Sequence, residues 1–96
     1  MEFTAISVAE LWNMIGQPNV YIVDLRERRE FGAFHLKGAV NYPYERMHCW
    51  EAELPKNKKI ILCCDYGNLS MLAAKKLAKK GYHIYTLIGG LNALNG

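Results

Sequence analysis

Cys64 is the residue of this sequence with the clearest potential for chemistry. It ends the apolar run Lys58 to Cys64, and Gly67 and a helical pattern follow within a few residues. The thiolate is the nucleophilic form of cysteine, and backbone amides at a helix N-terminus stabilise negative charge. We therefore expect Cys64 to be a nucleophile at a concave anion site. A small residue that simply packs in the core is the alternative.

The loop after Cys64 would supply that anion site. It consists of Asp65, Tyr66, Gly67, Asn68, Leu69 and Ser70. We expect the amides of residues 66–70 to curl around one point, which makes a binding site for a small anion. Gly67 permits the curl because glycine tolerates positive φ. Tyr66 is expected to project from the loop, and contact with a substrate is left open.

The other two cysteines are not expected to be nucleophiles. Cys49, Cys63 and Cys64 are an odd number without zinc-ligand spacing, so the sequence predicts neither a disulfide framework nor a metal site. Cys63 should point to the opposite side of its strand and pack there. Cys49 either packs or lies at the pocket rim, where it could form a disulfide with Cys64.

Strands that alternate with helices must position these residues. The strands are expected at 20–25, 39–42, 58–64 and 82–87, and the later helices at about 28–34 and 69–80, with a terminal turn after Gly89-Gly90. Ser7 and Glu10 form a capping box for a first helix that ends at Gly16, and its spacing places Trp12 in the core. This order predicts an α/β fold, a small parallel sheet with helices on both faces.

Composition limits the chain to one ordinary globular domain, which we place at residues 1–96. The sequence is 51% hydrophobic, 22% charged and has a formal net charge of +3. The longest apolar run, Ile60 to Cys64, is far shorter than a membrane span, and the acidic start does not resemble a signal peptide. A cytoplasmic protein without membrane or nucleic-acid partners is expected. The lysines at 75, 76, 79 and 80 should form the solvent face of a helix.

Three segments, in order, resemble the rhodanese-like domain family of sulfurtransferases. The first runs from Asp24-Leu25-Arg26 through Glu30-Phe31 to His35-Leu36-Lys37-Gly38-Ala39-Val40-Asn41-Tyr42-Pro43. The second is the strand and loop from Ile60 to Ser70, and the third is Leu87-Ile88-Gly89-Gly90. The similarity extends over about residues 3–94.

The resemblance implies a function for Cys64. It would accept a sulfane sulfur from a small anionic donor such as thiosulfate, with Cys64 to Leu69 as the active loop. The resulting persulfide would then pass its sulfur to a thiophilic acceptor, either a small thiol or a protein. No cofactor is implied, because the persulfide is itself the carrier. The resemblance also implies a structural role for His35. The short spacing of Asp24, Arg26 and Glu30 favours a local ion-pair network.

Two departures from the family pattern change this expectation. Asp65 places a carboxylate directly after the cysteine, which opposes ionisation of the thiol and repels a dianionic donor. Leu69 stands where the family often has Arg, Ser or Thr. We therefore expect weak activity with thiosulfate, and a catalytically weak binding or regulatory module is the alternative function. A phosphatase is disfavoured because Ser70 occupies the position of that branch's arginine.

Overall fold

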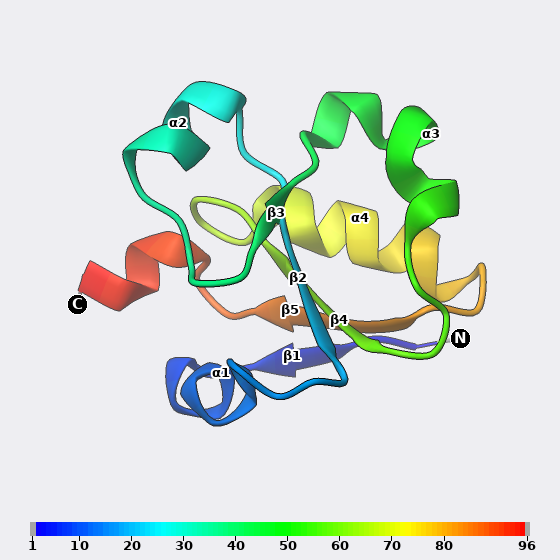
Figure 1. Ribbon diagram of the computed structural model, residues 1–96, viewed down its shortest axis with the longest axis horizontal. Coiled ribbons are helices and arrows are strands. Elements are labelled where there is room, and N and C mark those ends of the chain that lie inside the picture. Colours follow the sequence, from blue (N-terminus) through cyan, green and yellow to red (C-terminus); the bar gives the residue numbers. More distant parts are fainter. Residues whose placement is uncertain (1, 96) are drawn as a thin grey trace.

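Five parallel strands form the sheet of the computed structural model, which describes residues 2–95 (Figure 1). The strands are β1 (Thr4–Ile6), β2 (Val20–Asp24), β3 (Val40–Asn41), β4 (Lys59–Cys63) and β5 (His83–Leu87), arranged in the order β1-β5-β4-β2-β3. Both apolar runs that predicted inner strands form them, and β4 is buried from its second residue onward.

Helices cover both faces of the sheet, which confirms the predicted α/β fold (Figure 1). They are α1 (Val8–Met14), α2 (Arg28–Ala33), α3 (Met47–Trp50) and α4 (Asn68–Ala78), with 3₁₀ turns η1 (Tyr44–Arg46), η2 (Glu51–Glu53) and η3 (Leu91–Asn95). Residues of α3 and α4 pack on one face, while α1 and η3 contribute to the core on the other. Within residues 2–95, no helix has the length and apolar character needed to cross a membrane.

The side chains of β4, and of Cys64 directly after it, alternate between the two faces of the sheet. Ile60, Leu62 and Cys64 belong to the cluster that includes α4, whereas Ile61 and Cys63 belong to the cluster on the other face. This alternation follows from the two-residue period of a strand. The prediction that Cys63 and Cys64 point to opposite sides is therefore confirmed.

The predicted first helix is correct in its cap and wrong in one core residue. Ser7 Oγ accepts the Glu10 amide at 3.1 Å and Glu10 Oε1 accepts the Ser7 amide at 2.8 Å, so the capping box is present. Trp12, however, is 54% exposed, whereas Leu11 is fully buried. Adjacent helical residues point about 100° apart, so a helix with one narrow buried stripe cannot bury both.

The edge strand β1 was not predicted from the sequence. It has only three residues, and Thr4 and Ala5 are exposed. Its pairing with β5, in which Ile6 lies opposite Leu87, defines it as a strand. No hydrophobic alternation of useful length marks it, because the helix begins at Val8.

The strand order creates a crevice above the carboxyl ends of β2 and β4. The chain leaves β2 through α2 toward β3 on one side, and leaves β4 through α4 toward β5 on the other. Such a reversal of direction between neighbouring strands is where open parallel sheets bind ligands. The segments that follow β2 and β4 therefore meet at one place.

The C-terminal turn holds the loop that follows β4. The Leu91 amide donates to the Cys64 carbonyl at 2.8 Å, and the Asn92 amide donates to the Asp65 carbonyl at 2.9 Å. This approach requires glycine at position 90, where φ is +65° and a Cβ would lie 2.5 Å from the Cys64 carbonyl oxygen. A side chain there would push η3 away from the loop.

We predict that Gly90→Ala lowers the free energy of unfolding by about 2–4 kcal/mol, because left-handed strain adds to a steric clash. Gly16→Ala is the matched control, since Gly16 has φ +90° and open space where a Cβ would lie. It should lose only the strain, about 1–2 kcal/mol. Urea unfolding of both variants measures the difference, and equal losses would contradict the close approach at Gly90.

Candidate active site

Cys64 lies directly after β4 and is surrounded by the start of α4. The Gly67 amide donates to Cys64 Sγ at 3.1 Å, and the Ser70 amide donates to it at 3.4 Å. Gly67 is the N-cap of α4 with φ +97°, so the chain turns sharply enough for both amides to point at the sulfur. Amides at a helix N-terminus carry partial positive charge, and this geometry can stabilise a thiolate.

A cavity of about 300 Å³ opens onto this sulfur. It is lined by residues from the ends of β2 and β4, by η1 and by the first turns of α2 and α4, namely Leu25, Arg26, Glu27, Glu30, Glu45, Cys64, Asp65, Tyr66, Asn68 and Leu69. Cys64 is only 3% exposed but still contributes to the cavity wall. A small ligand in the cavity would therefore lie against Cys64, while most of the cysteine is shielded from water.

The cavity brings together most of the residues expected from the sequence. Asp65, Tyr66, Asn68 and Leu69 line it beside Cys64. Gly67 and Ser70 take part through their amides, and Ser70 Oγ also donates to the Gly67 carbonyl at 3.1 Å. Tyr66 projects from the loop and is 67% exposed.

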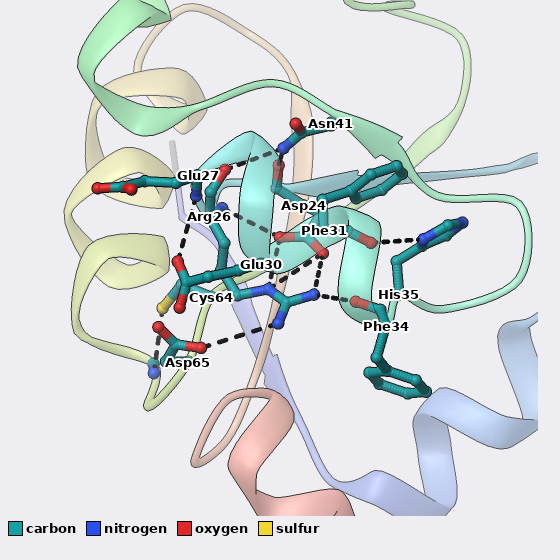
Figure 2. Close-up of polar contacts among 11 residues, drawn as sticks. Asp24, Arg26, Glu27, Glu30, Phe31, Phe34, His35, Asn41, Cys64 and Asp65 are labelled. Carbon is teal, nitrogen blue, oxygen red and sulfur yellow. Dashed lines mark hydrogen bonds and ion pairs between the residues drawn. The ribbon is translucent and has the colours of Figure 1, made fainter.

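A buried ion pair between Arg26 and Asp24 lies beside the loop that follows Cys64 (Figure 2), and Arg26 is one of the cavity-lining residues. Arg26 Nη2 lies 2.8 Å from Asp24 Oδ2, and Arg26 Nε donates to Asp24 Oδ1 at 3.0 Å. Hydrogen bonding to Asp24 is the main cause that raises the pKa of Arg26. Arg26 Nη2 also donates to the Phe34 carbonyl. The Asp24–Arg26 part of the expected ion-pair network is therefore present, with the guanidinium largely occupied.

Asp65 faces the same guanidinium from the active loop (Figure 2). Its Oδ1 lies 3.9 Å from Arg26 Nη1, at the outer limit of an ion pair, and its side chain is 47% exposed. Glu30 was expected in this network, but its Oε1 instead accepts the Glu27 amide at 3.3 Å. Arg26 is thus shared between one close carboxylate and one distant carboxylate.

Two further lining residues, Glu27 and Glu45, were missed by sequence reasoning. Glu27 follows the carboxyl end of β2, and the rule that parallel strand ends share one edge could have placed it near Cys64. Glu45 lies in η1, within a segment whose irregular pattern gave no indication of its position. Both are exposed at the cavity.

Several other candidates lie outside the cavity lining. His35 stacks on Phe31 at 3.8 Å between ring centroids, and its Nδ1 lies 2.8 Å from the Phe31 carbonyl oxygen, which fits a structural role. Cys49 is exposed and does not line the cavity with Cys64. Among residues 2–95, no group of three or more His, Cys, Asp or Glu side chains is placed to hold a metal ion.

Comparison with known families agrees with this arrangement. Residues 7–96 match the family model of the rhodanese-like domain. The chain belongs to the rhodanese-like domain family. In this rhodanese-like chain, the first family segment runs from the end of β2 through α2 to β3, and the second comprises β4, the loop after it and the first turn of α4. Both segments contribute residues to the cavity lining.

Several curated proteins are similar to this rhodanese-like chain over most of its length. Thiosulfate sulfurtransferase GlpE of Tolumonas auensis is 28% identical over 93% of this chain and 85% of its own. The GlpE protein of Shewanella oneidensis is 30% identical over 95% and 91%. The adenylyltransferase and sulfurtransferase uba4 of Ogataea parapolymorpha is 36% identical over 74% of this chain, which is 19% of that longer protein.

Solved structures share the same fold. The rhodanese homolog from the extremely thermophilic bacterium Thermus thermophilus has a TM-score of 0.76 at 32% identity, covering 93% of this chain and 98% of its own. A rhodanese-related protein from Thermoplasma volcanium has a TM-score of 0.88 at 24% identity, covering 97% and 92%. The similarity to the Thermoplasma volcanium protein is evidence for the fold alone.

The three cysteines should differ in alkylation of the folded protein. Burial raises the pKa of Cys63, which is 1% exposed, whereas Cys49 is exposed and Cys64 is reached through the cavity. We predict that iodoacetamide adds two groups to the native protein and a third only in urea. Cys64→Ser should take up one group, and the control Cys63→Ser should still take up two. Intact mass counts the added groups. Two groups on native Cys64→Ser would show that Cys64 is not one of the two cysteines alkylated in the wild type, which would contradict its access through the cavity.

Proposed function

We propose that this rhodanese-like chain is a sulfurtransferase that carries a sulfane sulfur on Cys64. The observation that carries the proposal is the Cys64 sulfur, which receives two backbone amides and forms part of the wall of a cavity. Similarity to thiosulfate sulfurtransferases over most of the chain supports the same function. The proposed mechanism assigns no side chain as a base, and the two amides stabilise negative charge on the sulfur.

In the first step, the Cys64 thiolate attacks the outer sulfur of the donor. A new S–S bond forms at Cys64, the donor's S–S bond breaks, and its electron pair leaves with the rest of the donor. With thiosulfate the leaving group is sulfite. The Gly67 and Ser70 amides remain directed at the sulfur and stabilise negative charge on the thiolate and the persulfide.

In the second step, an acceptor thiolate attacks the outer sulfur of the persulfide. The bond between the two sulfurs of the persulfide breaks, its electron pair returns to Cys64 as thiolate, and the acceptor leaves as a persulfide. Neither step needs an external oxidant or reductant. The resting enzyme is regenerated with Cys64 ready for another donor.

An intact-mass measurement tests this function. We expect the Cys49→Ser protein, which lacks the exposed thiol, to gain one sulfur atom after incubation with thiosulfate or inorganic polysulfide, and Cys49→Ser/Cys64→Ser to gain none. Cys49→Ser/Cys63→Ser is the matched control that should still gain it. A Cys49→Ser protein that takes up no sulfur from either donor would falsify the enzymatic proposal.

The second candidate function is a binding or regulatory module with little catalysis. Asp65 and Leu69 favour it, because a carboxylate follows the cysteine and no cationic or hydroxyl side chain occupies position 69. Donor binding would then rely on the loop amides alone. The same mass measurement separates the two functions, since a module without catalysis would leave Cys64 unmodified.

We predict that Asp65→Asn increases turnover with thiosulfate. The Asp65 carboxylate lines the cavity with Cys64, so it opposes both the thiolate and a dianionic donor. Its half-exposed position limits the effect to about two- to fivefold. The pH profile of Cys64 alkylation by iodoacetamide should shift to lower pH in the variant. Unchanged alkylation profiles in both Asp65→Asn and Asp65→Arg would show that the charge does not act on Cys64.

A further inference from the structure

The cavity around Cys64 has a strongly acidic lining. Four of its lining residues are carboxylates, namely Glu27, Glu30, Glu45 and Asp65, and Arg26 is the single cation among the described lining residues. Figure 2 shows Glu27, Glu30 and Asp65 on the same side of the site as Cys64. The whole chain carries a formal charge of +3, so the sign of the cavity is opposite to that of the molecule.

Arg26 does little to offset these carboxylates. Its side chain is 9% exposed, and it is bound to Asp24, which is 1% exposed and is not itself a lining residue. The Arg26 charge is therefore already balanced by a buried partner. Among the described lining carboxylates, Asp65 is the one in ion-pair range of Arg26, at 3.9 Å.

Two of the carboxylates are available to an incoming molecule. Glu27 and Glu45 are exposed, and neither forms an ion pair among residues 2–95. They approach the cavity from different segments, α2's N-cap and η1. A ligand that enters from solvent therefore meets negative charge from both segments before it reaches Cys64.

The charge of the cavity also acts in the second step of the reaction. Once Cys64 holds a sulfur, the anionic persulfide adds a further negative charge to the four carboxylates. An anionic acceptor is then repelled, whereas a positive group beside the acceptor sulfur is attracted. The amides of Gly67 and Ser70 offset this charge only at the sulfur itself, because they already point at Sγ.

We infer that the sulfur acceptor of this protein is a thiol with positive charge next to its sulfur. The inference rests on the proposed sulfurtransferase function and assigns the specificity of that site to Glu27 and Glu45. Two sources share this chemistry, a small aminothiol and a cysteine flanked by basic residues in a polypeptide. The acceptor thiolate attacks the outer persulfide sulfur and Cys64 leaves as thiolate, so the step needs no other reactant.

Sulfur transfer to thiols of different charge tests the inference. Wild-type protein is loaded with sulfur from inorganic polysulfide, separated from the donor, and mixed with cysteamine, 2-mercaptoethanol or 3-mercaptopropionate. This protein and every variant also carry Cys49→Ser, because the exposed Cys49 would itself take up sulfur from polysulfide. Loss of the sulfur is followed by intact mass. We expect the ratio of the cysteamine rate to the mercaptopropionate rate to fall about fivefold or more in Glu27→Gln/Glu45→Gln. The same rate ratio for the wild-type protein should fall similarly in about 1 M salt, where charges are screened within about 3 Å.

The control variant is Glu2→Gln/Glu53→Gln. It changes the net charge by the same amount as Glu27→Gln/Glu45→Gln but alters no residue that lines the Cys64 cavity. Its rate ratio should match the wild type. Comparing ratios between variants cancels the intrinsic reactivity of each thiol. Equal ratios in wild type and Glu27→Gln/Glu45→Gln would overturn the inference. If no variant accepts sulfur from polysulfide, the proposed function fails instead, so the two failures are distinguishable.

Two short peptides separate the sources of the positive charge. In one, a cysteine lies between two lysines, and in the other it lies between two glutamates. Faster transfer to the lysine peptide than to cysteamine would support a polypeptide acceptor, and the reverse would support a small aminothiol. Faster transfer to the glutamate peptide than to the lysine peptide would contradict the inference for either source.

Discussion

The abrupt turn from β4 into α4 is the constraint on which the site depends. The chain leaves the central strand at Cys63 and enters the helix at Asn68, so only four residues separate the two elements. Gly67 must adopt φ +97°, and the Gly90 backbone must lie against the carbonyls of Cys64 and Asp65. With both conditions met, two amides point at the Cys64 sulfur without any charged side chain. The thiol thus acquires an anion-stabilising environment from backbone geometry alone.

The electrostatics of the site combine two fields of opposite sign. The amides act over a short distance and favour negative charge on the sulfur, while the surrounding carboxylates act over a longer distance and disfavour anions in the cavity. Asp24 is responsible for much of this balance, because it binds Arg26, the one lining cation among the described residues. Stabilisation of negative charge on the Cys64 sulfur and repulsion of anionic ligands by the carboxylates can therefore act together in one small site.

The sheet topology brings these fields together. Asn41 Nδ2 on β3 donates to the carbonyls of Asp24 and Arg26, at 3.2 and 2.9 Å, and the Leu25 amide donates to the Cys63 carbonyl at 2.8 Å. The segment after β2 is thus fixed to β3 on one side and to β4 on the other. Glu27 and Cys64 then line the same cavity, although 37 positions separate them in the sequence.

The sequence by itself determined the inner strands, the capping box at Ser7 and the position of Cys64 before a helix, because these depend on local periodicity and on residues a few positions apart. It also predicts that the Asp65 carboxylate opposes negative charge on the adjacent cysteine, which stays a prediction. Tertiary structure decided the exposure of Trp12, the pairing of β1 and the gathering of Glu27 and Glu45 around Cys64. Those features depend on which distant segments meet at the sheet edge, and local pattern does not carry that information.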